Sequence, residues 1–115
     1  PNLEEINLPR LRLEYNNKKP IFNNLPKLRK ITFGYMYYQN QDVTMFNNLP
    51  NLENVYVTDA IYFRYIRYDM YPIAANVNSN AVLNFTNNSY NLKDSLKEVI
   101  NKHKNTLGFK TITFQ

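Results

Sequence analysis

The apolar positions of this chain follow a motif that recurs along the sequence. Pro-x-Leu-x-x-apolar-x-apolar occurs in residues 1–8, 26–33 and 50–57. The motif Leu residues, at positions 3, 28 and 52, are 25 and 24 residues apart. The tetrapeptide Phe-Asn-Asn-Leu precedes the second copy at residues 22–25 and the third copy at residues 46–49. Self-similarity at a period of this length is the signature of a repeat protein, so we predict a stack of similar units.

Two further units continue this pattern toward the C-terminus. Residues 80–85 and 109–114 fit a degenerate form of the motif, in which Asn80 and Phe109 replace the Leu after intervals of 28 and 29 residues. These longer units leave more room for the segment that returns the chain from one motif to the next. We therefore predict about five repeats in the whole chain.

The last return segment carries the pattern of a helix over residues 91–105. Its apolar residues, at helical spacing, are Leu92, Leu96, Val99 and Ile100. Asn91 and Asp94 resemble a capping box at its start, and Gly108 follows its end. The sequence thus predicts a helix between the last two motif copies.

Each motif copy itself has the alternation of a half-buried strand. Period-2 alternation places successive side chains on opposite faces of a sheet. The positions predicted to face the core are Leu3, Ile6, Leu8, Leu28, Ile31, Phe33, Leu52, Val55 and Val57. The residues between them are predicted to lie on the other, open face: Glu5, Asn7, Lys30, Thr32, Asn54, Tyr56, Val82, Asn84, Thr111 and Thr113.

A unit of this length, with a Leu-x-x-apolar-x-apolar strand and a helix or turn as return, resembles the leucine-rich repeat, and the resemblance covers essentially the whole chain. It implies an α/β solenoid of one domain, residues 1–115, with a parallel sheet on the concave face and helices and turns on the convex face. One departure concerns the Asn or Cys that usually follows the strand in this family. Pro9, Gly34 and Thr58 come after the three strand motifs instead. We therefore expect the usual Asn ladder to be missing and the solenoid to be irregular.

The open face is the first candidate for a binding surface, because solenoids commonly recognise partners with such surfaces. The predicted partner-binding residues are Lys30, Thr32, Asn54, Tyr56, Asn84 and Thr111. Lys30 and Tyr56 are the candidate anchors, since hot spots favour aromatic and long cationic side chains. The resemblance implies a non-catalytic protein-protein interaction module, such as the substrate-recognition end of an adaptor. The competing interpretation is a face that only contacts water.

A second candidate is the aromatic and basic segment of residues 61–72. Arg64, Tyr65, Arg67 and Tyr68 are interleaved there, as in proteins that stack on bases and neutralise phosphates. This pattern raises the alternative that the chain is a structural subunit of a ribonucleoprotein or other large assembly. The competing interpretation is a return helix that buries Phe63, Ile66 and Met70 on one face.

Composition narrows the chemistry available to the chain. Its 115 residues carry a net charge of +5 and include no Cys and one His. No carboxylate cluster has metal-ligand spacing, and no Gly-rich phosphate loop or Ser triad motif occurs. We expect no enzymatic activity, no cofactor, no small-molecule substrate and no membrane span. The absence of disulfides favours an intracellular setting.

Two further features are the frequent asparagine residues and the limits of the repeat pattern. The Asn doublets, such as Asn23-Asn24 and Asn47-Asn48, are interpreted as compositional bias, and the two glycosylation sequons at Asn84 and Asn87 as chance matches in an Asn-rich chain. The repeat pattern starts at Pro1 and ends at Phe114. We therefore expect the chain to be a fragment of a longer protein, with neighbouring sequence or a partner covering both edges of the sheet.

Overall fold

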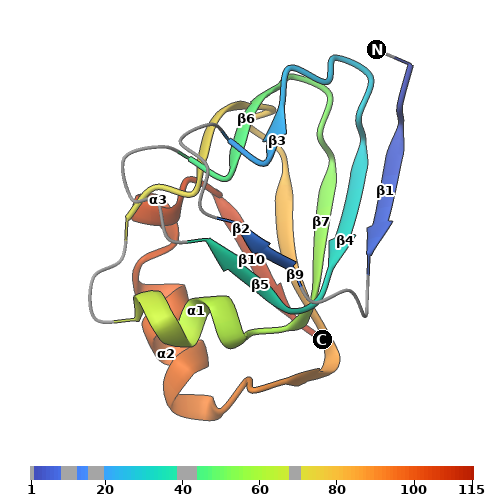
Figure 1. The fold of residues 1–115 in the computed structure, drawn as a ribbon. Coiled ribbons are helices and arrows are strands. Elements are labelled where there is room, and N and C mark those ends of the chain that lie inside the picture. Colours follow the sequence, from blue (N-terminus) through green and yellow to red (C-terminus); the bar gives the residue numbers. More distant parts are fainter. Residues whose placement is uncertain (1, 9–12, 16–19, 39–43, 68–70) are drawn as a thin grey trace.

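The computed structural model describes residues 2–8, 13–15, 20–38, 44–67 and 71–115. Its main feature is a five-stranded sheet in the order β1 (Glu5–Leu8), β4 (Lys30–Phe33), β7 (Asn54–Asp59), β9 (Val82–Tyr90) and β10 (Thr111–Phe114) (Figure 1). All neighbouring strands are parallel. Each strand contains one copy of the repeated motif, so the fold is mixed α/β with parallel sheets, as the repeats predict.

The register of this sheet follows the repeat alignment residue by residue. Ile6 pairs with Ile31, Ile31 with Val55, Val55 with Leu83, and Leu83 with Ile112. The degenerate copies therefore occupy the same positions as the regular ones. Since a slip of one residue would turn the apolar side chains to the wrong face, the apolar alternation determines this register.

A tight turn precedes β4 and another precedes β7. The N–H of Leu28 donates to the carbonyl of Leu25, and Leu52 donates to Leu49 in the same way. Pro26 and Pro50 occupy the second position of these turns, where the fixed φ of proline is favourable. The repeated Leu-Pro-x-Leu sequence is therefore the turn that precedes β4 and β7.

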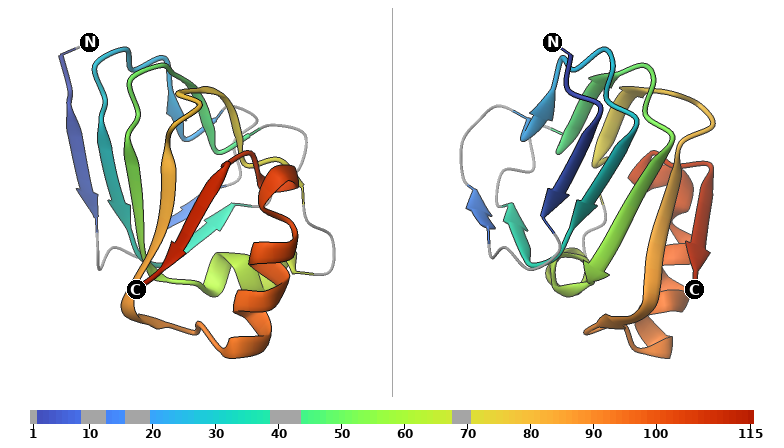
Figure 2. Two further views of the ribbon diagram at one scale, coloured as in Figure 1. Left: turned by 180° about the vertical axis from the view of Figure 1, so that it is seen from behind. Right: turned by 90° about the vertical axis from the view of Figure 1, so that its right-hand side faces the viewer.

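The return segments of the first two units contain strands rather than the expected helices. β2 (Leu13–Tyr15) pairs with β5 (Met36–Tyr38), and β3 (Phe22–Asn23), β6 (Phe46–Leu49) and β8 (Ala74–Val77) form a three-stranded sheet. These pairs are also parallel. Figure 2 shows both small sheets on one side of the five-stranded sheet. The expectation of helices and turns throughout this side is wrong for these units.

Helices occur in the later, longer units. α1 (Ile61–Ile66) follows β7, and α2 (Asp94–Lys102) and α3 (Lys104–Leu107) lie between β9 and β10. α1 packs against β5 and α2, so the layer begun by strands continues as helices. Among the described residues, no helix is long and apolar enough to cross a membrane.

The predicted C-terminal helix is confirmed in type, with two differences. It breaks at His103 into α2 and α3, and its first residue is Asp94, whose preceding Lys93 makes no side-chain cap. Asn91 is therefore not part of a capping box. Gly108 ends α3 with a φ of 102°, and a Cβ at this position would lie 2.6 Å from the carbonyl oxygen of Ala74. Only glycine fits this close approach.

The core lies between the five-stranded sheet and the return segments. Phe46 is at its centre, with ring centroids 5.3 Å from Phe22, 6.2 Å from Phe33 and 6.0 Å from Phe109. The motif residues Leu28, Ile31, Phe33, Leu52, Val55 and Val57 are buried as predicted.

The first unit departs from this pattern. Leu3 is 46% exposed, and Ile6 and Leu8 are only half-buried. The prediction that Leu3 belongs to the core is wrong, because β1 is an edge strand and only one neighbouring unit packs against it.

Asparagine stacks connect the units at β3, β6 and β8. The side chain of Asn47 donates to Asn23 over 2.9 Å and accepts from Asn76 over 3.3 Å, and Asn48 donates to Asn24 over 2.6 Å. Asn24, Asn48 and Asn76 have φ values of 57°, 54° and 55°, a left-handed conformation that Asn tolerates well. The doublets Asn23-Asn24 and Asn47-Asn48 thus have a structural role, which compositional bias does not explain.

Hydroxyl side chains near the ends of the main strands also connect neighbouring units. Thr58 Oγ1 donates to the carbonyl of Phe33, and Thr86 Oγ1 donates to that of Val57, both over 3.2 Å. Ser89 Oγ also donates to the Val57 carbonyl over 2.6 Å, next to a register shift between Val57 and Asp59. Units are therefore joined by side-chain hydrogen bonds at two places, the Asn stacks and the hydroxyl groups near the ends of the main strands.

Candidate binding surface

The open face of the five-stranded sheet consists of two rows of side chains, one residue from each strand. The first row is Glu5, Lys30, Asn54, Val82 and Thr111, and the second row is Asn7, Thr32, Tyr56, Asn84 and Thr113. The small sheets lie on the opposite side (Figure 2). The structure therefore brings all six predicted partner-binding residues onto one face, as the alternation predicts.

Lys30 and Tyr56 form a pair at the centre of this face. Lys30 Nζ lies 5.3 Å from the centroid of the Tyr56 ring. Lys30 is exposed and Tyr56 is half-buried. A cation over an aromatic ring is attracted by the negative face of the π system. The contact holds two long side chains in one arrangement, so that a charge and a ring edge are presented together.

Asn84 has a different environment from the other predicted contact residues. It is only 5% exposed. Its side-chain NH₂ lies 3.2 Å from Asn54 Oδ1 and 3.1 Å from the Val55 carbonyl, and its oxygen accepts from Thr113 Oγ1 over 2.8 Å. Asn84 joins β7, β9 and β10, and its side chain, covered by its neighbours, leaves little surface for the partner contact that was predicted for it. The same burial removes it as an accessible glycosylation acceptor.

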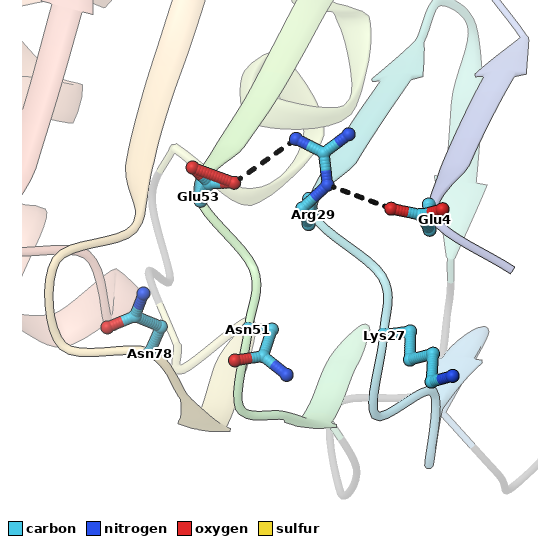
Figure 3. A pocket seen from close by; sticks show the side chains of 6 residues that line it. All are labelled: Glu4, Lys27, Arg29, Asn51, Glu53 and Asn78. Carbon is cyan, nitrogen blue, oxygen red and sulfur yellow. Dashed lines mark hydrogen bonds and ion pairs between the residues drawn. The ribbon is translucent and has the colours of Figure 1, made fainter. Parts of the chain in front are cut away.

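Glu4, Arg29 and Glu53 form a charged column beside the first row, each one residue before its strand. Arg29 Nε is 3.3 Å from Glu4 Oε1, and Arg29 Nη1 is 3.4 Å from Glu53 Oε2 (Figure 3). These hydrogen bonds, first to Glu4 and then to Glu53, raise the pKa of Arg29. All three side chains are exposed.

This column lines an open pocket of about 560 Å³, together with Lys27, Asn51 and Asn78 from the turns. In Figure 3 these three side chains lie along the turns below Arg29. Glu4, Arg29 and Glu53 occupy one motif position in three repeats, so their alternating charges were visible in the sequence. The sequence interpretation did not use this signal, because the position lies just outside the alternating strand.

The two arginines of the alternative basic and aromatic contact lie on or next to α1, away from the open face. Arg64, on α1, donates to Asn91 Oδ1 over 3.3 Å, and Asn91 donates to Asp59 Oδ1 over 2.8 Å. Arg67 is half-buried at the end of the same helix. The side chain of Tyr65 and the whole of Tyr68 lie outside the described residues. Arg64 is therefore held by a polar network between β7 and α1.

The competing interpretation of this segment is supported where the structure describes it. Phe63 and Ile66 are buried on α1, as a return helix requires. Met70 lies outside the described residues. The helix ends at Ile66, so it is shorter than the aromatic segment.

We also searched the described part of the chain for side chains that could bind a metal ion. There, no group of three or more His, Cys, Asp and Glu residues is placed to hold a metal ion. His103 is half-buried at the junction of α2 and α3.

No family model, curated protein or solved structure matches this chain. We therefore infer a function from the geometry of the open face.

Proposed function

We propose that this chain is a short leucine-rich-repeat-type solenoid that binds a protein partner through the open face of its five-stranded sheet. The observation that carries the proposal is the Lys30–Tyr56 pair, 5.3 Å from cation to ring centroid, in the middle of that face. The open face corresponds to the concave face of such a solenoid. The module acts by presenting side chains and performs no chemistry.

Three further observations support this proposal. The parallel register is continuous over five strands, which gives a solenoid-like stack of units. The open face is rich in uncharged polar groups, and it combines a ring and a cation of the kinds favoured at interface hot spots. Its backbone is held in the ladder, so binding would order few additional residues.

The test compares four versions of the full chain, each carrying an affinity tag in cells: wild type, Tyr56→Ala, Tyr56→Phe and Tyr90→Ala. Tyr90 is a suitable control because it is 74% exposed and lies outside both rows. The captured proteins are identified after nuclease treatment, and their affinity for each purified variant is measured. We expect Tyr56→Ala to lose about tenfold or more in affinity, while Tyr56→Phe and Tyr90→Ala bind as wild type.

Two results would contradict the proposal. One is a bound protein that Tyr56→Ala retains at wild-type affinity. The other is a partner released by nuclease, with an affinity that falls steeply with salt as phosphate neutralisation requires. The second result would favour the assembly-subunit hypothesis and direct attention to Arg64 and Arg67.

A further inference from the structure

The two edges of the five-stranded sheet carry complementary sets of backbone groups. At one edge, Glu4 and Leu8 accept from Lys30 and Gly34 of the next unit. Bonding groups alternate between the two sides of a parallel strand. The N–H and C=O groups of Glu5 and Asn7 therefore point away from β4, toward the free edge.

The opposite edge presents the matching set. Gln115 N–H donates to the carbonyl of Phe85, so the same alternation makes Thr111 and Thr113 bond to β9. Ile112 and Phe114 then direct their backbone groups outward. Within the sheet, each core-facing residue bonds to the following strand and each open-face residue to the preceding one. Among the described strands, β1 and β10 are the two edges of this sheet.

We propose that β1 of one copy of this chain pairs in parallel with β10 of a second copy, so that the molecules associate head to tail. The register that continues the ladder pairs Glu5 with Thr111, Ile6 with Ile112, Asn7 with Thr113 and Leu8 with Phe114. Each of these pairs joins two open-face residues or two core-facing residues, as the aligned motif residues do inside the sheet.

The side chains at the two edges also suit pairing with a second copy of this chain. Ile6 and Leu8 on β1, and Ile112 and Phe114 on β10, are half-buried and extend the two apolar rows of the core. Pairing would bring them together, and Leu3, now 46% exposed, would lie at the same junction. The association would therefore bury apolar surface as well as complete backbone hydrogen bonds.

The charges next to the two edge strands favour a second copy of this chain as the pairing partner. Glu4, Arg29 and Glu53 precede their strands at one motif position, and Arg29 bridges both neighbours. Lys110 occupies this position before β10 and is exposed. Ala81 occupies the position before β9 and is buried, and in the proposed register Lys110 of one copy lies beside Glu4 of the next, which gives one pair of opposite charges across the junction.

The geometry also determines the type of assembly. Pairing of β10 with β1 is heterologous, so each added copy leaves one free β1 edge and one free β10 edge. We therefore expect an open series of oligomers that grows with concentration. A symmetric dimer through one edge alone would stop at two copies.

The experiment is sedimentation velocity of the purified chain over a range of concentrations, with circular dichroism to check that each variant folds. Asn7→Pro removes an outward N–H from an edge strand, where proline is tolerated, and Asn7→Ala is its control. We expect Asn7→Pro to weaken association by about tenfold or more and Asn7→Ala to associate as wild type. Tyr56→Ala, which tests partner binding, is expected to leave self-association unchanged, so the two proposals can fail separately.

A charge exchange gives a second measurement. Glu4→Lys and Lys110→Glu should each weaken association by placing like charges at the junction, and the double variant should restore part of it. A wild-type chain that stays monomeric, a series that stops at the dimer, or association that Asn7→Pro leaves unchanged would overturn the proposal. So would a double exchange that associates less than both single variants.

Discussion

The two faces of the five-stranded sheet share one backbone and one register, yet they constrain their side chains very differently. On the core face, Ile31, Val55 and Leu83 are aligned and fully buried. On the open face, the aligned residues Lys30, Asn54 and Val82 differ in charge, polarity and size. A packed interior tolerates only apolar groups of suitable volume. The core face therefore keeps the repeated apolar pattern, and the open face is free to vary.

The open face is itself divided. Lys30 and Asn7 are exposed on β4 and β1, whereas Asn84 is buried on β9. Period-2 alternation determines which face a side chain occupies, and its neighbours determine whether water or a partner can reach it. Substitutions on the two faces should therefore differ in their effects on stability, and Asn84 should behave as part of the interior.

The largest effect is expected for Ile31→Asp. It places an unpaired carboxylate between strands in a fully buried position, and the free energy of unfolding should fall by more than about 4 kcal/mol. That loss is comparable to the whole stability of many domains. Circular dichroism and urea unfolding measure it, and Ile31→Val, expected to cost about 0.5 to 1.5 kcal/mol, is the control. A normal unfolding transition for Ile31→Asp would contradict the assignment of the core face.

An intermediate effect is expected for Asn84→Ala. Removing this side chain removes its hydrogen bonds to Asn54 Oδ1, the Val55 carbonyl and the Thr113 hydroxyl. The free energy of unfolding should therefore fall by about 1 to 3 kcal/mol. Thr32→Ala, in the same row but half-buried, should change stability by less than about 0.5 kcal/mol. Equal effects in urea unfolding would show that the open face is not divided.

The smallest effect on stability is expected for Arg29→Ala. Its ion pairs with Glu4 and Glu53 are exposed to solvent and salt, and such pairs contribute little. The pKa of Arg29 is raised, so its contribution is present below the ordinary pKa of arginine and is lost only at extreme alkaline pH. Thermal unfolding at neutral pH should match wild type at low and high salt. A clear, salt-sensitive loss would show that the charged column stabilises the fold.

Much of the main sheet was predictable from local pattern. The motif alignment placed Ile6, Ile31, Val55, Leu83 and Ile112 in one row, and they pair in that order. Gly108 marked the end of the last helix correctly. These features depend on alternation and on backbone conformations that few residues adopt, and both can be recognised in sequence.

The return segments were less predictable. Phe22 and Phe46 belong to short strands because neighbouring units align them, and their local sequence has no strand alternation. The Asn stacks also need two units in register before a side chain of one can reach the next. A single repeat contains no partner for these groups, so neither feature has a local signal beyond its recurrence.

The repeated apolar pattern was enough to predict the number of strands in the main sheet, their parallel register and the face that each motif residue occupies, because the apolar period is a local property of the chain. Which of those residues are accessible follows from the packing of the units. Leu3 is exposed because β1 has one neighbour, and Asn84 is buried because Asn54 and Thr113 cover it from two neighbouring strands. Exposure depends on what stacking brings alongside a residue, and residues distant in sequence supply it.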